Sequence, residues 1–353
     1  MLDPIPPPPQ IVSQLTQPLA DALGLKTLPF HIHEVILAFA VYTWVNFSLA
    51  PVLSSKLFPT IYRNLAPRTK VNWDVHVVSL FQSCTINFLA LWVMYVDQER
   101  KEMSWQERVW GYTGAGGMIQ GFAAGYFVWD LMITLMNIDC FGYSMLAHAI
   151  SALTVFSLGF RPFVNFYGPT FILYEMSSPF LNIHWFFDKT NMTGTRAQLI
   201  NGLLLLVTFF SCRLVWGTYQ SVRVYQDVWA ALQAPRRKMA LGNATMSAVT
   251  EGAGDSVSEM MMFAGDEVVP VWLAIVYLGS NVVLNTLNFY WFGKMIEALR
   301  KRFQQPSQAE KTVHSNGDAT TSVKASGADV DYATEPHHRV VPVETEDDVD
   351  IVM

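Results

Sequence analysis

Seven stretches of the sequence contain at most one charged residue each and are rich in Leu, Val, Ile, Phe and Trp. Crossing the hydrocarbon core of a bilayer takes about 20 apolar residues in helical form, at a rise of 1.5 Å per residue. The pattern therefore predicts an all-α membrane protein with about seven transmembrane helices. The predicted helices cover residues 33–55, 75–96, 114–137, 143–160, 163–184, 198–221 and 269–293.

The alternative interpretation is a large soluble protein with buried helices. Helices of soluble proteins usually carry a polar stripe and mostly run 8–20 residues, so seven long charge-poor stretches favour the membrane. The opening MLDPIPPPPQ lacks the basic and then apolar plan of a signal peptide. We expect the first predicted helix to remain in the protein as a signal anchor.

Composition divides the chain into parts. Residues 1–32 form a proline-rich N-terminal segment, and residues 33–67 contain the first helix and a basic loop. Residues 68–303 hold the other six helices, with a Gly, Ala and Ser-containing loop at 222–267 that we expect to be flexible. Residues 304–353 are polar, acidic and poor in aromatic residues, which predicts a disordered tail.

The charges are unevenly distributed along the chain. The net charge is −6, yet the 304–353 tail alone carries ten acidic and three basic residues, so the remainder is close to neutral. No basic face for nucleic acid is present. The tail could bind a cytosolic protein partner, although a solvated tail is the simpler interpretation. The three cysteines, Cys84, Cys140 and Cys212, have neither a disulfide framework nor metal-ligand spacing.

Four ionisable residues lie inside the predicted spans: Asp130, His148, Glu175 and Arg213. An ionisable group in hydrocarbon costs about 2.5–3.5 kcal/mol or more, so such residues are typical of functional sites. At 1.5 Å per residue, the first three lie roughly 8–14 Å from the cytosolic helix ends and Arg213 roughly 22 Å. We therefore predict a catalytic or lipid head-group site at these four residues. An ion pair of Arg213 with Glu175 could also be purely structural.

The last span carries Asn281, Asn285 and Asn288 at i, i+4 and i+7, on one helical face. Lipid does not tolerate such a face, so we expect it to look into the bundle, for structure or for function. A second small-residue face is expected to pack closely against another helix. It consists of Gly117, Gly121 and Gly125.

Other chemistry has little support in the sequence. There is no phosphate-binding loop, dinucleotide fingerprint or nucleophile elbow. His31, His33 and Glu34 at the start of the first span could bind a metal ion, but histidines at i and i+2 point to different faces of a helix. An interfacial polar cluster is the better interpretation, and no metal site and no cofactor are predicted.

Several motifs together resemble a known family. They are Lys70-Val-Asn-Trp73 with the following HVVSLFQS, Tyr126-Phe-Val-Trp-Asp130, His148, Tyr174-Glu-Met-Ser-Ser-Pro-Phe180, Asn182-Ile-His-Trp185-Phe-Phe, Phe209-Phe-Ser-Cys-Arg213 and Leu287-Asn-Phe-Tyr-Trp291. The pattern is similar to the TLC-domain family, which includes the TRAM proteins and the Lag-type ceramide synthases. It most resembles the branch of TLC domain-containing protein 4, in a fungal-type version.

The resemblance implies a six-helix TLC bundle, formed by the second to seventh helices, in a protein of the endoplasmic reticulum with a role in membrane lipids. Ceramide synthases carry paired histidines and then His-Asp-x-Ser-Asp; here the first histidine corresponds to Ala147 and only His148 remains. The later positions correspond to Tyr174, Glu175, Ser177 and Ser178. Each lost acid–base role costs roughly 10²–10⁴ in rate, which argues against ordinary ceramide synthesis.

Three functions are consistent with these residues. The first is a protein of lipid homeostasis that binds or senses a membrane lipid within its bundle, without being an enzyme. The alternative is a divergent ceramide synthase-like N-acyltransferase that takes acyl-CoA as co-substrate, with His148 as base and Glu175 as its orienting group. A transporter ranks third, because no internal repeat is evident. The residues expected to line the pocket are Tyr174, Ser177, Ser178, Asn281, Asn285 and Asn288.

Two glycosylation sequons test the orientation. Basic residues near helix ends favour a cytosolic C-terminus once those far inside the 222–267 loop are discounted. We therefore expect Asn243, followed by Ala-Thr, to be lumenal and glycosylated, and Asn191, followed by Met-Thr, to remain unmodified. Endoglycosidase treatment should remove a mobility shift that depends on Asn243. A shift that depends on Asn191 instead would invert the topology.

Overall fold

The computed structural model describes residues 1–233, 260–264 and 269–304, and the regular elements in these ranges are helices. The predicted acidic tail and Asn243 lie outside the described residues. The chain divides into two compact units, one ending at Phe289 and one beginning at Tyr290, and each is described by itself. All residues discussed below as parts of a site belong to the first unit.

Six helical stretches of the described part are long and apolar enough to cross a membrane. They comprise α2 (Leu28–Trp44) running through η1 (Val45–Leu49) into α3 (Ala50–Leu57), α5 (Pro67–Val96), α7 (Trp105–Trp110) with α8 (Gly114–Met136), α9 (Ile138–Leu158), α12 (Arg196–Phe209) running through η4 (Phe210–Trp216) into α13 (Gly217–Gln233), and α16 (Val271–Gln304). The predicted all-α multi-pass fold is confirmed.

The predicted span at 163–184 is not one helix. It consists of η2 (Asn165–Tyr167), α10 (Gly168–Ile172), η3 (Leu173–Ser177) and α11 (Ser178–Lys189). Pro169 and Pro179 stand in the first turns of α10 and α11, and proline cannot donate the backbone hydrogen bond that would continue a preceding helix. The break therefore lies within the bundle and turns several polar side chains of this segment toward its interior.

Two predicted boundaries need correction. The first span begins at Leu28, not at residue 33, and the predicted 222–267 loop is helical as far as Gln233, because α13 continues there. The extension of α13 buries Val224, Val228 and Ala231, which recur at the spacing of one helical face.

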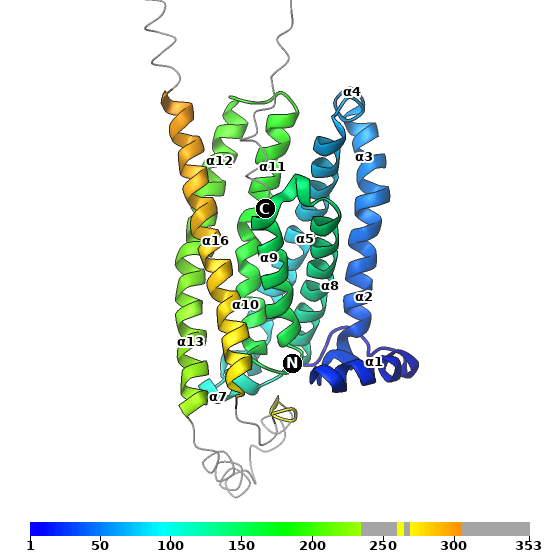
Figure 1. Cartoon of the computed structure of the whole chain (residues 1–353), viewed down its shortest axis with the longest axis vertical. Helices are drawn as coiled ribbons and strands as arrows, with labels where there is room; N and C mark the ends of the chain where they lie inside the picture. Colours follow the sequence, from blue (N-terminus) through cyan, green and yellow to red (C-terminus); the bar gives the residue numbers. More distant parts are fainter. Residues whose placement is uncertain (234–259, 265–268, 305–353) are drawn as a thin grey trace, which may run out of the picture. The chain divides into compact units, whose positions relative to one another are not determined.

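Three shorter helices lie before or between the long ones in the sequence. They are α1 (Gln10–Leu23), α4 (Pro59–Tyr62) and α6 (Gln98–Lys101). Helix α1 packs against α2 and lies across its end (Figure 1). The predicted proline-rich segment thus contains an amphipathic helix, whose exposed apolar side chains have the character of a helix at a membrane surface. These side chains are Ile11, Leu15, Leu19 and Leu23.

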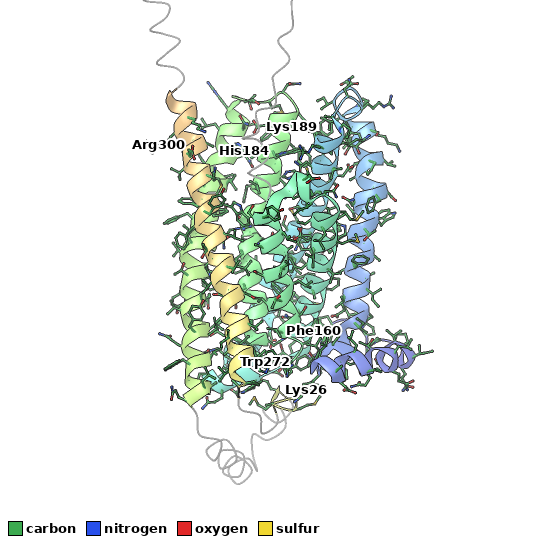
Figure 2. The ribbon with its side chains drawn as sticks, viewed as in Figure 1. Lys26, Phe160, His184, Lys189, Trp272 and Arg300 are labelled. Atoms are coloured by element: carbon green, nitrogen blue, oxygen red, sulfur yellow. The ribbon has the colours of Figure 1, made fainter. Side chains whose placement is uncertain are left out.

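The two ends of the bundle carry different groups. Figure 2 shows Lys26 and Phe160 at one end and Lys189 with His184 toward the other. The helices of this unit run side by side between these ends, with α8 between α2 and α9 and with α11 between α5 and α12 (Figure 1). Lys26 and Lys189 therefore lie at opposite ends of these helices.

The glycine face of α8 packs against α2, as the small-residue spacing predicts. A methyl group at Gly117 would overlap the His31 ring, and one at Gly121 would lie 2.5 Å from a carboxylate oxygen of Glu34. A methyl group at Gly125 would overlap the backbone carbonyl of Val35. Backbone cannot move aside as a flexible side chain can, so the last position tolerates a side chain least.

We expect Gly125→Ala to lower the thermal stability of the protein in detergent. Forcing a methyl group into a packed interface typically costs about 1–3 kcal/mol. Gly279→Ala is the matched control, because a methyl group at Gly279 would meet no atom within 4 Å and alanine favours a helix over glycine. Equal melting temperatures for the two variants in a fluorescence-based unfolding assay would contradict this account of the α2–α8 contact.

Candidate functional site

A small cavity lies inside the bundle, and polar side chains from four segments line part of it. Its lining residues are Phe127, His148, Ala152, Val155, Phe156, Phe171, Ile172, Tyr174, Glu175, Arg213, Asn281, Leu284 and Asn288. The cavity volume is about 30 Å³. That is enough for one or two water molecules in a polar setting, and too little for a lipid chain.

Arg213 is the centre of the polar network around this cavity, and it is buried. Its Nε donates to Ser177 Oγ at 2.9 Å and one Nη donates to Ser178 Oγ at 3.0 Å. The other Nη donates to Asn288 Oδ1 at 3.2 Å. The same guanidinium reaches Glu175, with 4.0 Å between nitrogen and oxygen. Hydrogen-bonded partners in this number are what a buried charge requires.

The backbone departs from a regular α-helix both in the segment that carries Arg213 and in the segment that carries its serine partners. Arg213 lies in the π-helical stretch η4, and π-helical turns are frequent at functional sites. Its two serine partners lie where η3 ends and α11 begins. Ser178 also donates to Glu175 Oε2 at 2.7 Å, so one hydroxyl connects the guanidinium and the carboxylate.

Glu175 and Arg213 lie at the same level, contrary to the depths that we predict from the sequence. The predicted difference arises because the fifth span is taken to end at residue 184. Helix α11 continues to Lys189, so Glu175 lies farther from the helix end than expected. The two residues meet through their shared partner Ser178.

The asparagine face of α16 looks into the bundle, as its spacing predicts. Asn281 and Asn288 are buried and line the cavity. Asn285 does not line it, but receives a hydrogen bond from the Tyr174 hydroxyl at 3.3 Å and donates to Ser221 Oγ at 3.0 Å. The face therefore connects the broken fifth segment with α13.

The four predicted ionisable residues have different positions. His148 and Glu175 line the cavity together with Arg213. The ring of His148 packs edge-on to Phe127, with 6.2 Å between the centroids. Asp130 is buried, but it is not one of the lining residues.

A second polar cluster joins α5 to α11 and does not follow from the charge pattern. His76 Nδ1 lies 2.6 Å from Asn182 Oδ1, and Asn182 donates to Ser79 Oγ at 3.0 Å. The His76 ring stacks on Trp185 with 4.3 Å between the centroids. His76 Nε2 is buried without a hydrogen-bond partner. The signal in the sequence is that two of the quoted motifs contain these residues.

A third polar cluster joins α7, η2 and α13. Asp227 accepts two hydrogen bonds from the Arg108 guanidinium, at 2.7 and 2.8 Å, and one from the Tyr167 hydroxyl at 2.6 Å. Next to it, Arg100 donates to the carbonyl of Phe166 at 2.9 Å. Burial lowers the pKa of Arg100 to about 10, which still leaves it charged at neutral pH.

The fold and this site define a class: a multi-pass, all-helical membrane protein with a polar centre inside its bundle. The model of the TLC domain matches residues 72–297 of the chain. A TLC domain-containing protein of Schizosaccharomyces pombe is 34% identical over 84% of this chain and 89% of its own length. The chain belongs to the TLC domain family.

Two further proteins, one from yeast and one from human, are similar to this chain. Topoisomerase I damage affected protein 4 of Saccharomyces cerevisiae is 27% identical over 80% of this chain and 88% of its own length. TLC domain-containing protein 4 of Homo sapiens is 24% identical over 54% of this chain and 69% of its own length. The matched TLC domain begins at residue 72, so it does not include α1 and α2.

We expect Arg213→Gln to destabilise the bundle strongly. Removing one partner of a buried charge network typically costs about 3–5 kcal/mol, because the remaining groups lose their compensation. The stability of Arg213→Lys should lie between that of Arg213→Gln and that of the parent protein. An ammonium group keeps the charge but cannot make the paired hydrogen bonds of a guanidinium. The exposed Arg196→Gln is the control. Thermal unfolding in detergent measures all three, and equal stability of Arg213→Gln and Arg196→Gln would refute the network's role.

Proposed function

We propose that this protein acts in membrane lipid homeostasis in the endoplasmic reticulum and binds the polar head group of a membrane lipid at the Arg213 centre. The observation that supports the proposal most is the lining of the cavity. A cation, a carboxylate, an imidazole and a pair of amides, which come from four segments, converge on one space between apolar side chains. Such a mixture suits a ligand with a charged head and an apolar remainder.

The volume of the cavity limits how a lipid can bind. At about 30 Å³ it accommodates water or a few head-group atoms. Binding therefore requires the helices that line it to move apart, and the acyl chains to stay against the apolar side chains. Ligand-induced opening of this kind needs a difference in affinity between the closed and the open bundle.

An N-acyltransferase that uses acyl-CoA is the second candidate. The observation in its favour is that His148 and Glu175 line the same cavity, where an imidazole could accept the proton of an attacking amine. Ala147 and Tyr174 argue against it, because they occupy positions where the synthases carry histidines. The broken fifth segment is a feature that transporters share, but no internal repeat accompanies it.

Copurified lipid tests the first proposal. We expect mass spectrometry of the purified protein to detect one lipid class at near-stoichiometric amount, and Asn288→Ala to retain at least several-fold less of it. Asn201→Ala is the matched control, because Asn201 is a buried amide that bonds the Phe180 carbonyl away from the cavity. Equal lipid content in the two variants would contradict head-group binding at this cavity.

The acyltransferase alternative and the location have separate readouts. The purified protein would be given a sphingoid base and labelled acyl-CoA; formation of an amide product that is lost in His148→Ala would replace the first proposal with the second. Flux of lipid across protein-containing vesicles would favour the transporter. Imaging of the tagged full chain against an endoplasmic-reticulum marker tests the location, and a signal confined to another membrane would contradict it.

A further inference from the structure

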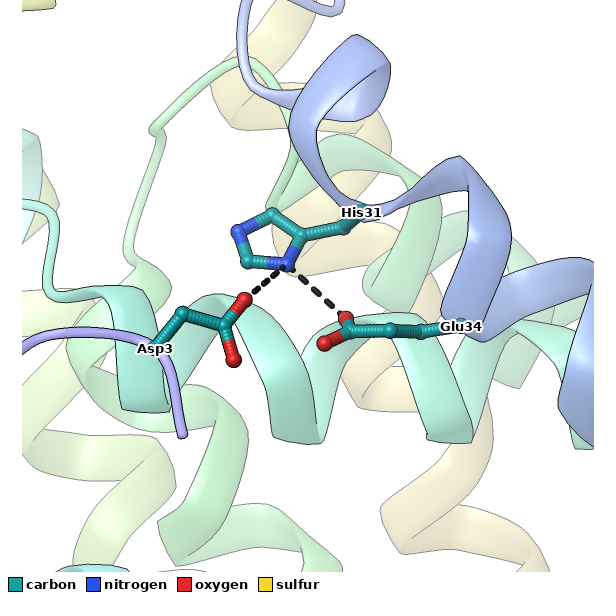
Figure 3. A group of neighbouring side chains, drawn as sticks. All are labelled: Asp3, His31 and Glu34. Carbon is teal, nitrogen blue, oxygen red and sulfur yellow. Dashed lines mark hydrogen bonds and ion pairs between the residues drawn. The ribbon is translucent and has the colours of Figure 1, made fainter. Parts of the chain in front are cut away.

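A compact group of metal-ligating side chains lies outside the cavity, at the end of the bundle where α2 begins. It consists of Asp3, His31 and Glu34, whose ligand atoms all lie within 4.8 Å of one another. His31 Nδ1 is 2.8 Å from Glu34 Oε2 and 3.2 Å from Asp3 Oδ2. Figure 3 shows both carboxylates directed at the same ring nitrogen.

Hydrogen bonding alone satisfies this group poorly. An imidazole nitrogen carries at most one hydrogen, and two carboxylate oxygens approach the same nitrogen. Glu34 is fully buried, and its second oxygen has no hydrogen-bond partner. Buried carboxylate oxygens without a partner are costly, so a further positive group would stabilise the arrangement.

A divalent cation would satisfy all three side chains at once. Metal–ligand bonds of about 2.0–2.2 Å at right or tetrahedral angles separate neighbouring ligand atoms by roughly 2.8–3.6 Å. The two nitrogen–oxygen distances fall in that interval. Two carboxylates would also neutralise the charge of the cation, which favours its burial.

The surroundings of His31 suit its role as a metal ligand. With Nδ1 on the metal, Nε2 carries the hydrogen and donates to the Tyr112 hydroxyl, which lies at 2.6 Å. Metal-bound imidazoles usually have such a partner for their second nitrogen. Gly117 and Gly121 of α8 leave the room in which the His31 ring and the Glu34 carboxylate lie.

We propose that Asp3, His31 and Glu34 form a binding site for Zn²⁺. One imidazole with two carboxylates is a donor set that suits zinc better than calcium or magnesium, which prefer oxygen alone. Three protein ligands leave one coordination position open. The site ties the segment before α1 to the start of α2. It lies outside the matched TLC domain and does not depend on the function proposed for the cavity.

Of the two neighbouring histidines in the sequence, only His31 belongs to the group. His33 lies two residues from His31 and is not part of the group. The carboxylate one helical turn after His31 takes the place of a second histidine, because residues at i and i+3 share a face. Asp3 is far from both in the sequence and is brought there by the chain before α1.

Zinc content and affinity of the full chain test the site. The protein would be purified in detergent with an affinity tag that uses no metal, and its zinc measured by mass spectrometry. We expect about one zinc per chain and a visible absorption spectrum of four-coordinate cobalt after exchange with Co²⁺. Competition with a chromophoric chelator should show at least a tenfold loss of zinc affinity in Asp3→Asn and in Glu34→Gln.

His33→Gln is the matched control and should keep the affinity of the parent. Asp3 is partly exposed, so Asp3→Asn remains informative even if Glu34→Gln fails to fold. A parent protein that takes up no stoichiometric zinc would overturn the proposal. So would equal affinities of Asp3→Asn and His33→Gln, because zinc would then be bound elsewhere.

Discussion

A guanidinium inside a membrane bundle must have its hydrogen-bond donors matched, and the arrangement around Arg213 follows from that requirement. Its partners come from the broken fifth segment and from α16, while a π-helical stretch carries the residue itself. A regular helix at 165–177 would place Ser177 and Ser178 differently with respect to the guanidinium. The irregular backbone is therefore tolerated where polar side chains of the bundle surround it, as is general for membrane proteins.

The two polar centres of the molecule differ in how they are built. The cavity centre lies within the matched TLC domain, and hydrogen bonds between neutral and charged groups satisfy much of it. The Asp3–His31–Glu34 group lies in the preceding part of the chain and concentrates negative charge around one imidazole. Helix α8 contributes to both, through Phe127 at the cavity and Gly117 near His31.

Apolar length and charge gaps are sufficient to predict the fold, because few structures other than helices can cross hydrocarbon. The inward orientation of Asn281 and Asn288 likewise follows from spacing alone. The break of the fifth segment does not, since this segment has as few charged residues as the intact spans and the spacing of charges is insensitive to a missing hydrogen bond at Pro169. The common level of Glu175 and Arg213 depends on the continuation of α11 to Lys189. Asp3 cannot be paired with His31 from the sequence, because only the folded chain brings them together.

The contact between α2 and the glycine face of α8 also has a consequence for biosynthesis. Ribosomes deliver α2 to the membrane well before α8, so His31 and Glu34 enter the bilayer boundary before the surface that covers them exists. During that interval α2 is held only by its hydrophobicity and by whatever assists insertion. The N-terminal part of the protein therefore reaches its final arrangement after the third span has been inserted, although it is translated first.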